Sequence, residues 1–190
     1  MPSELKPVVE FTPELHLKAQ SIRIAFFDVD GVLTDGGLYY DASGECLKRF
    51  NALDGLGLKL LNKAGIVPVV ISGRESPALR MRLTDLRIAH FQLGAERKLE
   101  VAESFLRQFS LTWSEAAVIG DDWPDIPMMA RSKLACATPA AHAQVRQLAD
   151  YVTRSEGGHG AAREFCDLLL VASGNYARLL RAVQDSPSSG

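Results

Sequence analysis

The chain contains a continuous apolar run, residues 22–27, that leads directly into two aspartates and a glycine. An uninterrupted apolar run of this length is typical of a strand that is buried on both faces of a parallel sheet. Asp28 and Asp30 are two residues apart, so they leave the end of that strand on similar sides. Two like charges at a buried strand end repel each other unless a cation neutralises them. The run therefore predicts a parallel sheet with a divalent metal at its carboxyl end, and one carboxylate free to attack an electrophile.

Strands and helices alternate along the rest of the chain. Apolar residues and capping signals predict helices at 53–64, 76–86, 96–109, 125–130, 141–148 and 161–173. Short apolar runs between them predict strands at 67–71, 88–92, 116–119, 134–137 and 150–153. This alternation indicates an α/β fold, a doubly wound parallel sheet with helices on both faces.

We expect one domain over residues 1–190, because neither an internal repeat nor a linker rich in Gly, Pro and Ser interrupts the chain. Its parts are an N-terminal arm or helix, 1–20, a core, 22–153, and a C-terminal part, 154–190. The C-terminal part combines a glycine-rich hinge, a terminal helix and a tail, and residues 186–190 are expected to be disordered.

Composition excludes several kinds of partner. The net charge is −2, so no basic field points to nucleic acid or to an anionic membrane. No apolar run approaches the roughly 20 residues that span a bilayer, and the N-terminus lacks the apolar segment of a signal peptide. Cys46, Cys136 and Cys166 lie far apart and fit neither a disulfide framework nor a zinc site. We therefore expect a cytoplasmic protein without a nucleic-acid or membrane partner.

Polar clusters follow three of the predicted strands. Asp28 follows the first strand, residues 72–74 follow the second and residues 120–122 follow the fourth. In such sheets ligands bind outside the carboxyl ends of the strands, so we expect the three clusters at one edge. Lys98, in the first turn of a helix, can point at the same edge. Several carboxylates in one crevice call for a hard cation with oxygen ligands, and Mg²⁺ is the usual choice beside phosphate.

Each of these residues also has a plainer interpretation. Asp30 and Asp121 could be helix caps or turn residues. Ser72 could cap the next helix, bind an anion together with the Gly73 N–H, or do both. Lys98 could be a solvated lysine, although a cation at a helix start opposes the helix dipole unless an anion lies nearby. The joint pattern favours phosphoryl transfer, in which a carboxylate attacks phosphorus, cations neutralise the phosphoryl oxygens and a second acid moves protons.

These segments resemble the four ordered motifs of the haloacid dehalogenase superfamily, at residues 28–35, 71–74, 98 and 120–125. The resemblance implies that Asp28 is the nucleophile and Asp30 the general acid/base, and that Ser72 and Lys98 hold phosphate. It also implies Mg²⁺ as cofactor, with a ligand set made of Asp28, the backbone carbonyl of Asp30, and Asp121, supported by Asp122 and Asp125. Further candidates for substrate contact are Gly31, Thr34, Lys48, Gly73 and Arg74.

Residues 37–50 predict a β-hairpin with its turn at residues 41–44, where many phosphatases of this superfamily carry a cap domain. A hairpin alone cannot seal a pocket, so either the substrate is large or neighbouring subunits close the site. Its apolar residues, Leu38, Tyr39, Tyr40 and Phe50, favour subunit contact over packing on their own sheet. Arg74 could bind a substrate carboxylate or pair with an acid across that interface.

Two further segments, 48–57 and 156–167, resemble 3-deoxy-D-manno-octulosonate (KDO) 8-phosphate phosphatases. This implies a capless homotetramer that releases phosphate from a sugar-acid phosphate in lipopolysaccharide precursor synthesis, with a neighbour covering each site and a glycine-rich tail able to fold over it. His159 departs from the arginine expected in many relatives. Three glycines before a helix, at 157, 158 and 160, indicate a flexible hinge.

Three alternatives stay open at this point. A related nine-carbon keto-sugar-acid phosphate could be the substrate. A receiver-like phospho-Asp domain also combines Asp, Ser/Thr, Lys and Mg²⁺, although Asp30 favours turnover over a long-lived phosphate. A non-catalytic binding domain is disfavoured, because every group that the chemistry needs is present.

Overall fold

The computed structural model describes residues 10–185, and its centre is a six-stranded sheet. The strands run in the order β5-β4-β1-β6-β7-β8, and every neighbouring pair is parallel. Their bounds are β1 Ile24–Phe27, β4 Val67–Ile71, β5 Phe91–Gln92, β6 Ala116–Gly120, β7 Leu134–Ala137 and β8 Tyr151–Val152. The start of the predicted arm and the disorder predicted for 186–190 lie outside the described residues.

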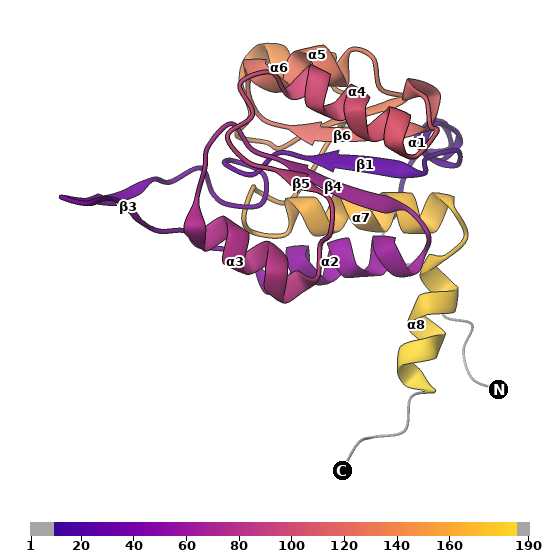
Figure 1. Ribbon diagram of the computed structural model, residues 1–190. Coiled ribbons are helices and arrows are strands. Elements are labelled where there is room, and N and C mark those ends of the chain that lie inside the picture. Colours follow the sequence, from indigo (N-terminus) through magenta and orange to yellow (C-terminus); the bar gives the residue numbers. More distant parts are fainter. Residues whose placement is uncertain (1–9, 186–190) are drawn as a thin grey trace.

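Helices cover both faces of the sheet (Figure 1). One face carries α2 Ala52–Lys63, α3 Pro77–Leu86 and α7 Ala161–Ala172, and the other carries α4 Lys98–Gln108, α5 Ile126–Met129 and α6 Ala143–Leu148. Successive side chains of β1 alternate between these layers, so Phe27 packs in one buried cluster and Phe26 in the other. The predicted doubly wound fold is confirmed. Within the described residues no helix is long and apolar enough to cross a membrane.

The strand order tests one of the alternatives. Numbered along the sequence, the six strands of this sheet follow the order 3-2-1-4-5-6, whereas receiver-type sheets follow 2-1-3-4-5. The order reverses between β1 and β6, which are the two strands that precede Asp28 and Asp121. Ligands bind at this switch point of open α/β sheets, so the topology excludes the receiver fold and points to the edge where the acidic motifs lie.

The predicted hairpin is present as β2 Tyr39–Asp41 and β3 Gly44–Leu47, and it projects away from the sheet (Figure 1). Leu38, Tyr39 and Tyr40 are exposed, and Phe50 packs against the core. The alternative that these residues pack on their own sheet therefore holds for Phe50 and not for the other three.

The N-terminal arm contains a helix, α1 Pro13–Ala19, which contacts α7, as the arm-or-helix prediction allowed.

The C-terminal part contains one helix more than predicted. Gly174, with φ +71°, ends α7, and α8 Tyr176–Gln184 follows where the sequence predicts a tail. That prediction was wrong although the signal is present in the sequence, because Tyr176, Leu179, Leu180 and Val183 recur at the spacing of one helix face.

Candidate active site

A cleft of about 550 Å³ opens at the carboxyl ends of β1, β4 and β6. Its walls include Asp28 after β1, Gly73 and Arg74 after β4, and Asp121 after β6. Lys98, the first residue of α4, also faces the cleft. The structure thus brings the predicted clusters together at one edge, as the sheet rule requires.

Lys98 is buried between two carboxylates. Its Nζ lies 2.6 Å from Asp28 Oδ1 and 2.7 Å from Asp125 Oδ1, so the solvated-lysine interpretation is wrong. Burial, and next the charge of Asp125, raises the pKa of Asp28 well above its usual value. Burial alone would lower the pKa of Lys98, but the two carboxylates raise it overall, so this lysine stays cationic. An ionised Asp28 therefore depends on neighbouring cations.

Carboxylate oxygens of Asp28, Asp121 and Asp125 lie within 4.8 Å of one another. Burial, and next the charge of Asp125, raises the pKa of Asp121 to about 6. Crowded oxygen donors that hold protons in the absence of metal fit a hard divalent cation. Asp125 is already engaged, because its Oδ1 meets Lys98 and its Oδ2 accepts the N–H groups of Asp121 and Asp122 at 3.1 and 3.4 Å. It therefore fits a supporting role better than a ligand role.

Asp122 is exposed, and its carboxylate accepts the N–H of Trp123 at 2.8 Å. It caps the short 3₁₀ turn Trp123–Asp125, which carries Asp125 into the site. Asp122 therefore stabilises the backbone turn that positions Asp125.

The loop after β1 keeps its shape through Gly31 and Thr34. Gly31 has φ +89°, and a Cβ there would lie 2.1 Å from Asp121 Oδ2, so only glycine lets the loop approach this carboxylate. The buried Thr34 hydroxyl donates to Val29 O at 3.4 Å and accepts the Gly36 N–H at 3.2 Å. Both residues are predicted substrate contacts, and in the structure their contacts hold the loop.

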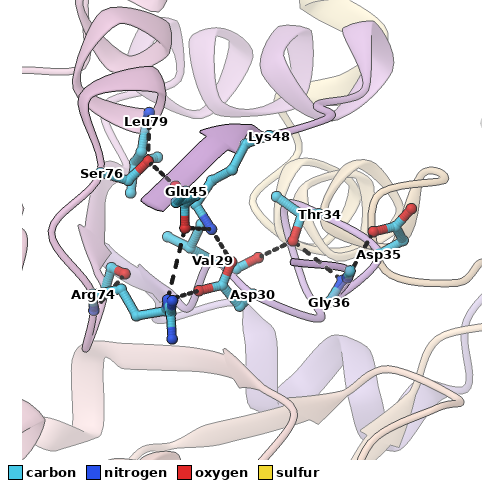
Figure 2. Close-up of polar contacts among 12 residues, drawn as sticks. Val29, Asp30, Thr34, Asp35, Gly36, Glu45, Lys48, Arg74, Ser76 and Leu79 are labelled. Atoms are coloured by element: carbon cyan, nitrogen blue, oxygen red, sulfur yellow. Dashed lines mark hydrogen bonds and ion pairs between the residues drawn. The ribbon is translucent and has the colours of Figure 1, made fainter. Parts of the chain in front are cut away.

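Asp30 lies on the hairpin side of the cleft (Figure 2). Its Oδ1 is 2.5 Å from Lys48 Nζ, and its Oδ2 is 3.9 Å from Arg74 Nε. Glu45, on β3, lies 3.3 Å from the same Lys48 Nζ. Burial alone would raise the pKa of Glu45, but hydrogen bonds from Ser76 and Lys48 hold it below its usual range. Glu45 was not predicted, and Ser76 was predicted only as the start of a helix. The sequence signal for this group was the three-residue spacing of Glu45 and Lys48.

Ser72 is buried at the end of β4, and its hydroxyl accepts the Arg74 N–H at 3.1 Å. The residue that caps α3 is Ser76, where the sequence predicts the start of this helix, so the alternative of Ser72 as its cap is wrong. The Arg74 guanidinium donates to the Tyr40 hydroxyl and lies 3.8 Å from Glu45. Arg74 therefore contacts its own hairpin, and its two predicted partners, a substrate carboxylate and a neighbour's acid, stay predictions.

The glycine-rich segment 156–160 packs against the loop after β1. The Gly158 N–H donates to Val32 O at 2.9 Å, and a Cβ at Gly157 would lie 2.0 Å from Gly31 O. Glycine is therefore needed for close packing of two backbones, a reason that the hinge prediction did not include.

The glycine-rich segment also lines a second cavity, which lies beside the cleft at the strand ends. Asp54 accepts the Gly160 N–H at 3.3 Å and so ties the segment to α2. His159 lines this second cavity of about 550 Å³, and Gly36 and Asp121 line both this cavity and the cleft described above. The glycine-rich segment is thus part of the wall beside the acidic cluster.

Fold, switch point and ordered motifs together define a hydrolase of the haloacid dehalogenase-like class. A family model with that description matches residues 96–165. The KDO 8-phosphate phosphatase KdsC of Haemophilus influenzae is 43% identical over 157 residues, which cover 83% of this chain and 87% of the relative. KdsC of Escherichia coli K12 is 41% identical, over 83% and 84%. This chain therefore belongs to the family of KDO 8-phosphate phosphatases.

Solved structures agree with that assignment. The KDO 8-phosphate phosphatase of Moraxella catarrhalis, solved with magnesium, phosphate and KDO, has a TM-score of 0.87 and 34% identity, covering 92% of this chain and 100% of that one. A probable YrbI-family phosphatase from Pseudomonas syringae has a TM-score of 0.88 and 41% identity, over 92% and 99%.

Proposed function

We propose that the protein is a Mg²⁺-dependent phosphatase that hydrolyses KDO 8-phosphate to KDO and phosphate through an aspartyl-phosphate. The observation that carries the proposal is the group formed by the buried Asp28 and Lys98 and the half-buried Asp121 at the switch point of the sheet. The family supports the substrate, because the Moraxella relative was solved with magnesium, phosphate and KDO. The nine-carbon alternative has no corresponding support.

The residues present fit Mg²⁺, since the clustered carboxylates supply hard oxygen donors. Asp28, Asp121 and the backbone carbonyl of Asp30 would hold the ion. When bound, it would offset the burial and the carboxylate repulsion that raise the pKa of Asp28, and it would neutralise charge on the phosphoryl group.

The first chemical step forms a bond between an Asp28 oxygen and phosphorus. The bond from phosphorus to the sugar oxygen breaks, and that oxygen takes its electron pair together with the proton of the Asp30 carboxyl. In the second step Asp30 takes a proton from water, the water oxygen attacks phosphorus, and the Asp28 carboxylate leaves. Lys98, already cationic beside Asp28, offsets the phosphoryl charge in both steps.

The open cleft also supports the expected assembly. The hairpin projects from the site and exposes Leu38, Tyr39 and Tyr40, a surface that suits contact with other subunits. We infer a homotetramer in which a neighbour helps to cover the cleft, while Gly73 and Arg74 meet the substrate from β4. We also assign the enzyme to the cytoplasm, where Cys46, Cys136 and Cys166, all free in the structure, would stay reduced.

A phosphate-release assay tests the function. Purified protein with Mg²⁺ should release phosphate from KDO 8-phosphate with a kcat/KM at least tenfold above that for the nine-carbon keto-acid phosphate and for simple sugar phosphates. A chelator should stop the reaction, and Mg²⁺ should restore it. Release from every ester except KDO 8-phosphate would reject the substrate and keep the phosphatase chemistry, and no release from any ester would reject both.

A further inference from the structure

Lys48 is a deeply buried cation beside the cleft, and the proposed reaction assigns it no role. Its side chain is 1% exposed, although the residue directly follows the projecting hairpin. The residues that line the cleft include Asp30 and Arg74 but not Lys48. A lysine loses strong hydration on burial, so a buried ammonium requires carboxylate partners. The question is what this lysine does for the partners that it has.

Its partners join the hairpin to the catalytic edge (Figure 2). Lys48 Nζ lies 2.5 Å from Asp30 Oδ1 and 3.3 Å from Glu45 Oε2. Glu45 in turn accepts the hydroxyl of Ser76 at 2.6 Å. Ser76 is fixed because it caps α3. The ion pair with Glu45 therefore fixes the position of the Lys48 ammonium, which contacts Oδ1 of Asp30.

From this geometry we infer that Lys48 is a positioning residue for Asp30, and that Glu45 and Ser76 hold Lys48 in place. The inference rests on the proposed phosphatase function. With Oδ1 held by Lys48, the oxygen of Asp30 left to exchange a proton with the leaving sugar oxygen is Oδ2, which lies 3.9 Å from Nε of the cleft-lining Arg74. Lys48 orients this carboxyl and does not touch the substrate.

Two other roles must be separated from this one. Lys48 could be a structural ion pair, whose loss would lower every activity together. It could instead bind the sugar, as the sequence predicts, and its loss would then weaken substrate binding. Positioning of a general acid gives a different result, because a leaving group that departs without a proton does not need the acid.

The test compares two esters in the holoenzyme. KDO 8-phosphate releases an alcohol, which needs the acid, and p-nitrophenyl phosphate releases a phenolate, which does not. Because kcat/KM reports only the steps up to the first irreversible one, the second half of the reaction does not enter. Lys48→Met should lower kcat/KM for KDO 8-phosphate by about 10- to 100-fold, and for the aryl ester by less than about threefold. Lys48→Arg should restore most of the loss.

A binding measurement removes the sugar-contact alternative. In the inactive Asp28→Asn background, Lys48→Met should change the Kd for KDO 8-phosphate, measured by calorimetry, by less than about twofold. Lys18→Met is the matched control, since Lys18 pairs with Asp150 on the surface. It should leave both reactions unchanged. If Lys48→Met does not fold, Glu45→Gln/Lys48→Met removes both buried charges together and carries the same test.

An equal loss with both esters, no loss with either, or a Kd raised tenfold would overturn the positioning role and leave the phosphatase function standing. A wild-type protein that is inactive with both esters would overturn the function and, with it, the inference.

Discussion

Asp28 and Asp30 are two residues apart, each faces a buried lysine, and the two lysines come from different parts of the molecule. Asp28 meets Lys98, the first residue of α4, which packs on the sheet. Asp30 meets Lys48, the residue that follows β3 of the projecting hairpin. The side chain of Asp28 is 9% exposed and that of Asp30 is 23% exposed. The core thus fixes the proposed nucleophile, whereas a protruding element fixes the proposed acid.

The difference suits the two roles. A nucleophile must approach phosphorus along one line, so a rigid frame favours it. A group that gives and takes protons must also exchange them with the leaving group and with water, so it needs access to the cleft. Asp30 lines that cleft, and its lysine approaches from behind.

Substitution of the two aspartates should have the largest effect. Asp28→Asn replaces the nucleophilic carboxylate with a neutral amide and should reduce phosphate release by more than about 10⁴-fold with any ester. Asp30→Asn should cost about 10²- to 10⁴-fold with KDO 8-phosphate, and much less with an aryl ester that needs no proton. Steady-state kinetics on both esters, with circular dichroism to confirm folding, measures this. Retained turnover in Asp28→Asn would reject Asp28 as the nucleophile.

Substitution of Lys98 should lower the free energy of unfolding more than substitution of Lys48. Lys98→Met leaves Asp28 and Asp125 buried without their cation and should lower the free energy of unfolding by about 3–5 kcal/mol without Mg²⁺. Lys48→Met should cost less, about 1–3 kcal/mol, because Asp30 is better solvated and Arg74 stays near Glu45. Urea unfolding measures both. Equal losses would contradict the contrast between core and hairpin.

The Lys98 side of the site could be predicted from the sequence, and the Lys48 side could not. Asp28, Lys98 and Asp121 follow strands or begin a helix, and the geometry of a parallel sheet places such residues at one edge whatever the loops do. The apolar periodicity of the strands and the order of the motifs along the chain were therefore sufficient to predict that these three residues lie close together.

Lys48 and Ser76 meet at Glu45 because the β3 strand of the hairpin lies against the start of α3. The sequence pattern does not encode the orientation of the hairpin relative to α3. The turn at residues 41–44 could be predicted from its residue types, but the direction in which the hairpin projects could not. The same limit applies to the direction in which α8 leaves α7, because that direction depends on the left-handed Gly174.

The acidic cluster should make the effect of Mg²⁺ depend on pH. Without metal, the pKa of Asp28 is raised well above its usual value and that of Asp121 is raised to about 6. A carboxyl whose pKa is raised by folding stabilises the protein below its unfolded pKa of about 4, and this stabilisation is lost as pH rises through the folded value. The contribution of these groups to the Tm of the metal-free protein should therefore fall between about pH 4 and pH 7.

Saturating Mg²⁺ should then raise Tm by several degrees at pH 7.5 and by clearly less at pH 5, since about 1 kcal/mol moves Tm by about 2–4 °C in a chain of this size. Differential scanning fluorimetry measures the shift. Asp121→Asn should remove most of the Mg²⁺ effect at pH 7.5, while Asp85→Asn, on the exposed face of α3, should keep it. The same Mg²⁺ shift at both pH values would contradict the carboxylate cluster as the metal site.

The smallest effect on stability is expected at the exposed side of the hairpin. Tyr39 and Leu47 are cross-strand partners and are 43% and 55% exposed. Replacing both with serine should change the stability of the isolated subunit by less than about 1 kcal/mol, because each side chain buries little in its own chain. In a homotetramer held by the hairpins, the same change should produce smaller species in size-exclusion chromatography with light scattering.

Leu17→Ser is the matched control, because Leu17 is 67% exposed on α1, away from the hairpin, and should leave the assembly intact. If subunit contacts hold the hairpin in position, the dissociated variant should lose activity with KDO 8-phosphate and keep it with the aryl ester, since Lys48 and Asp30 depend on the hairpin while Lys98 and Asp28 do not. An unchanged assembly in the Tyr39/Leu47 variant would show that the exposed apolar side chains of the hairpin are not the subunit contact.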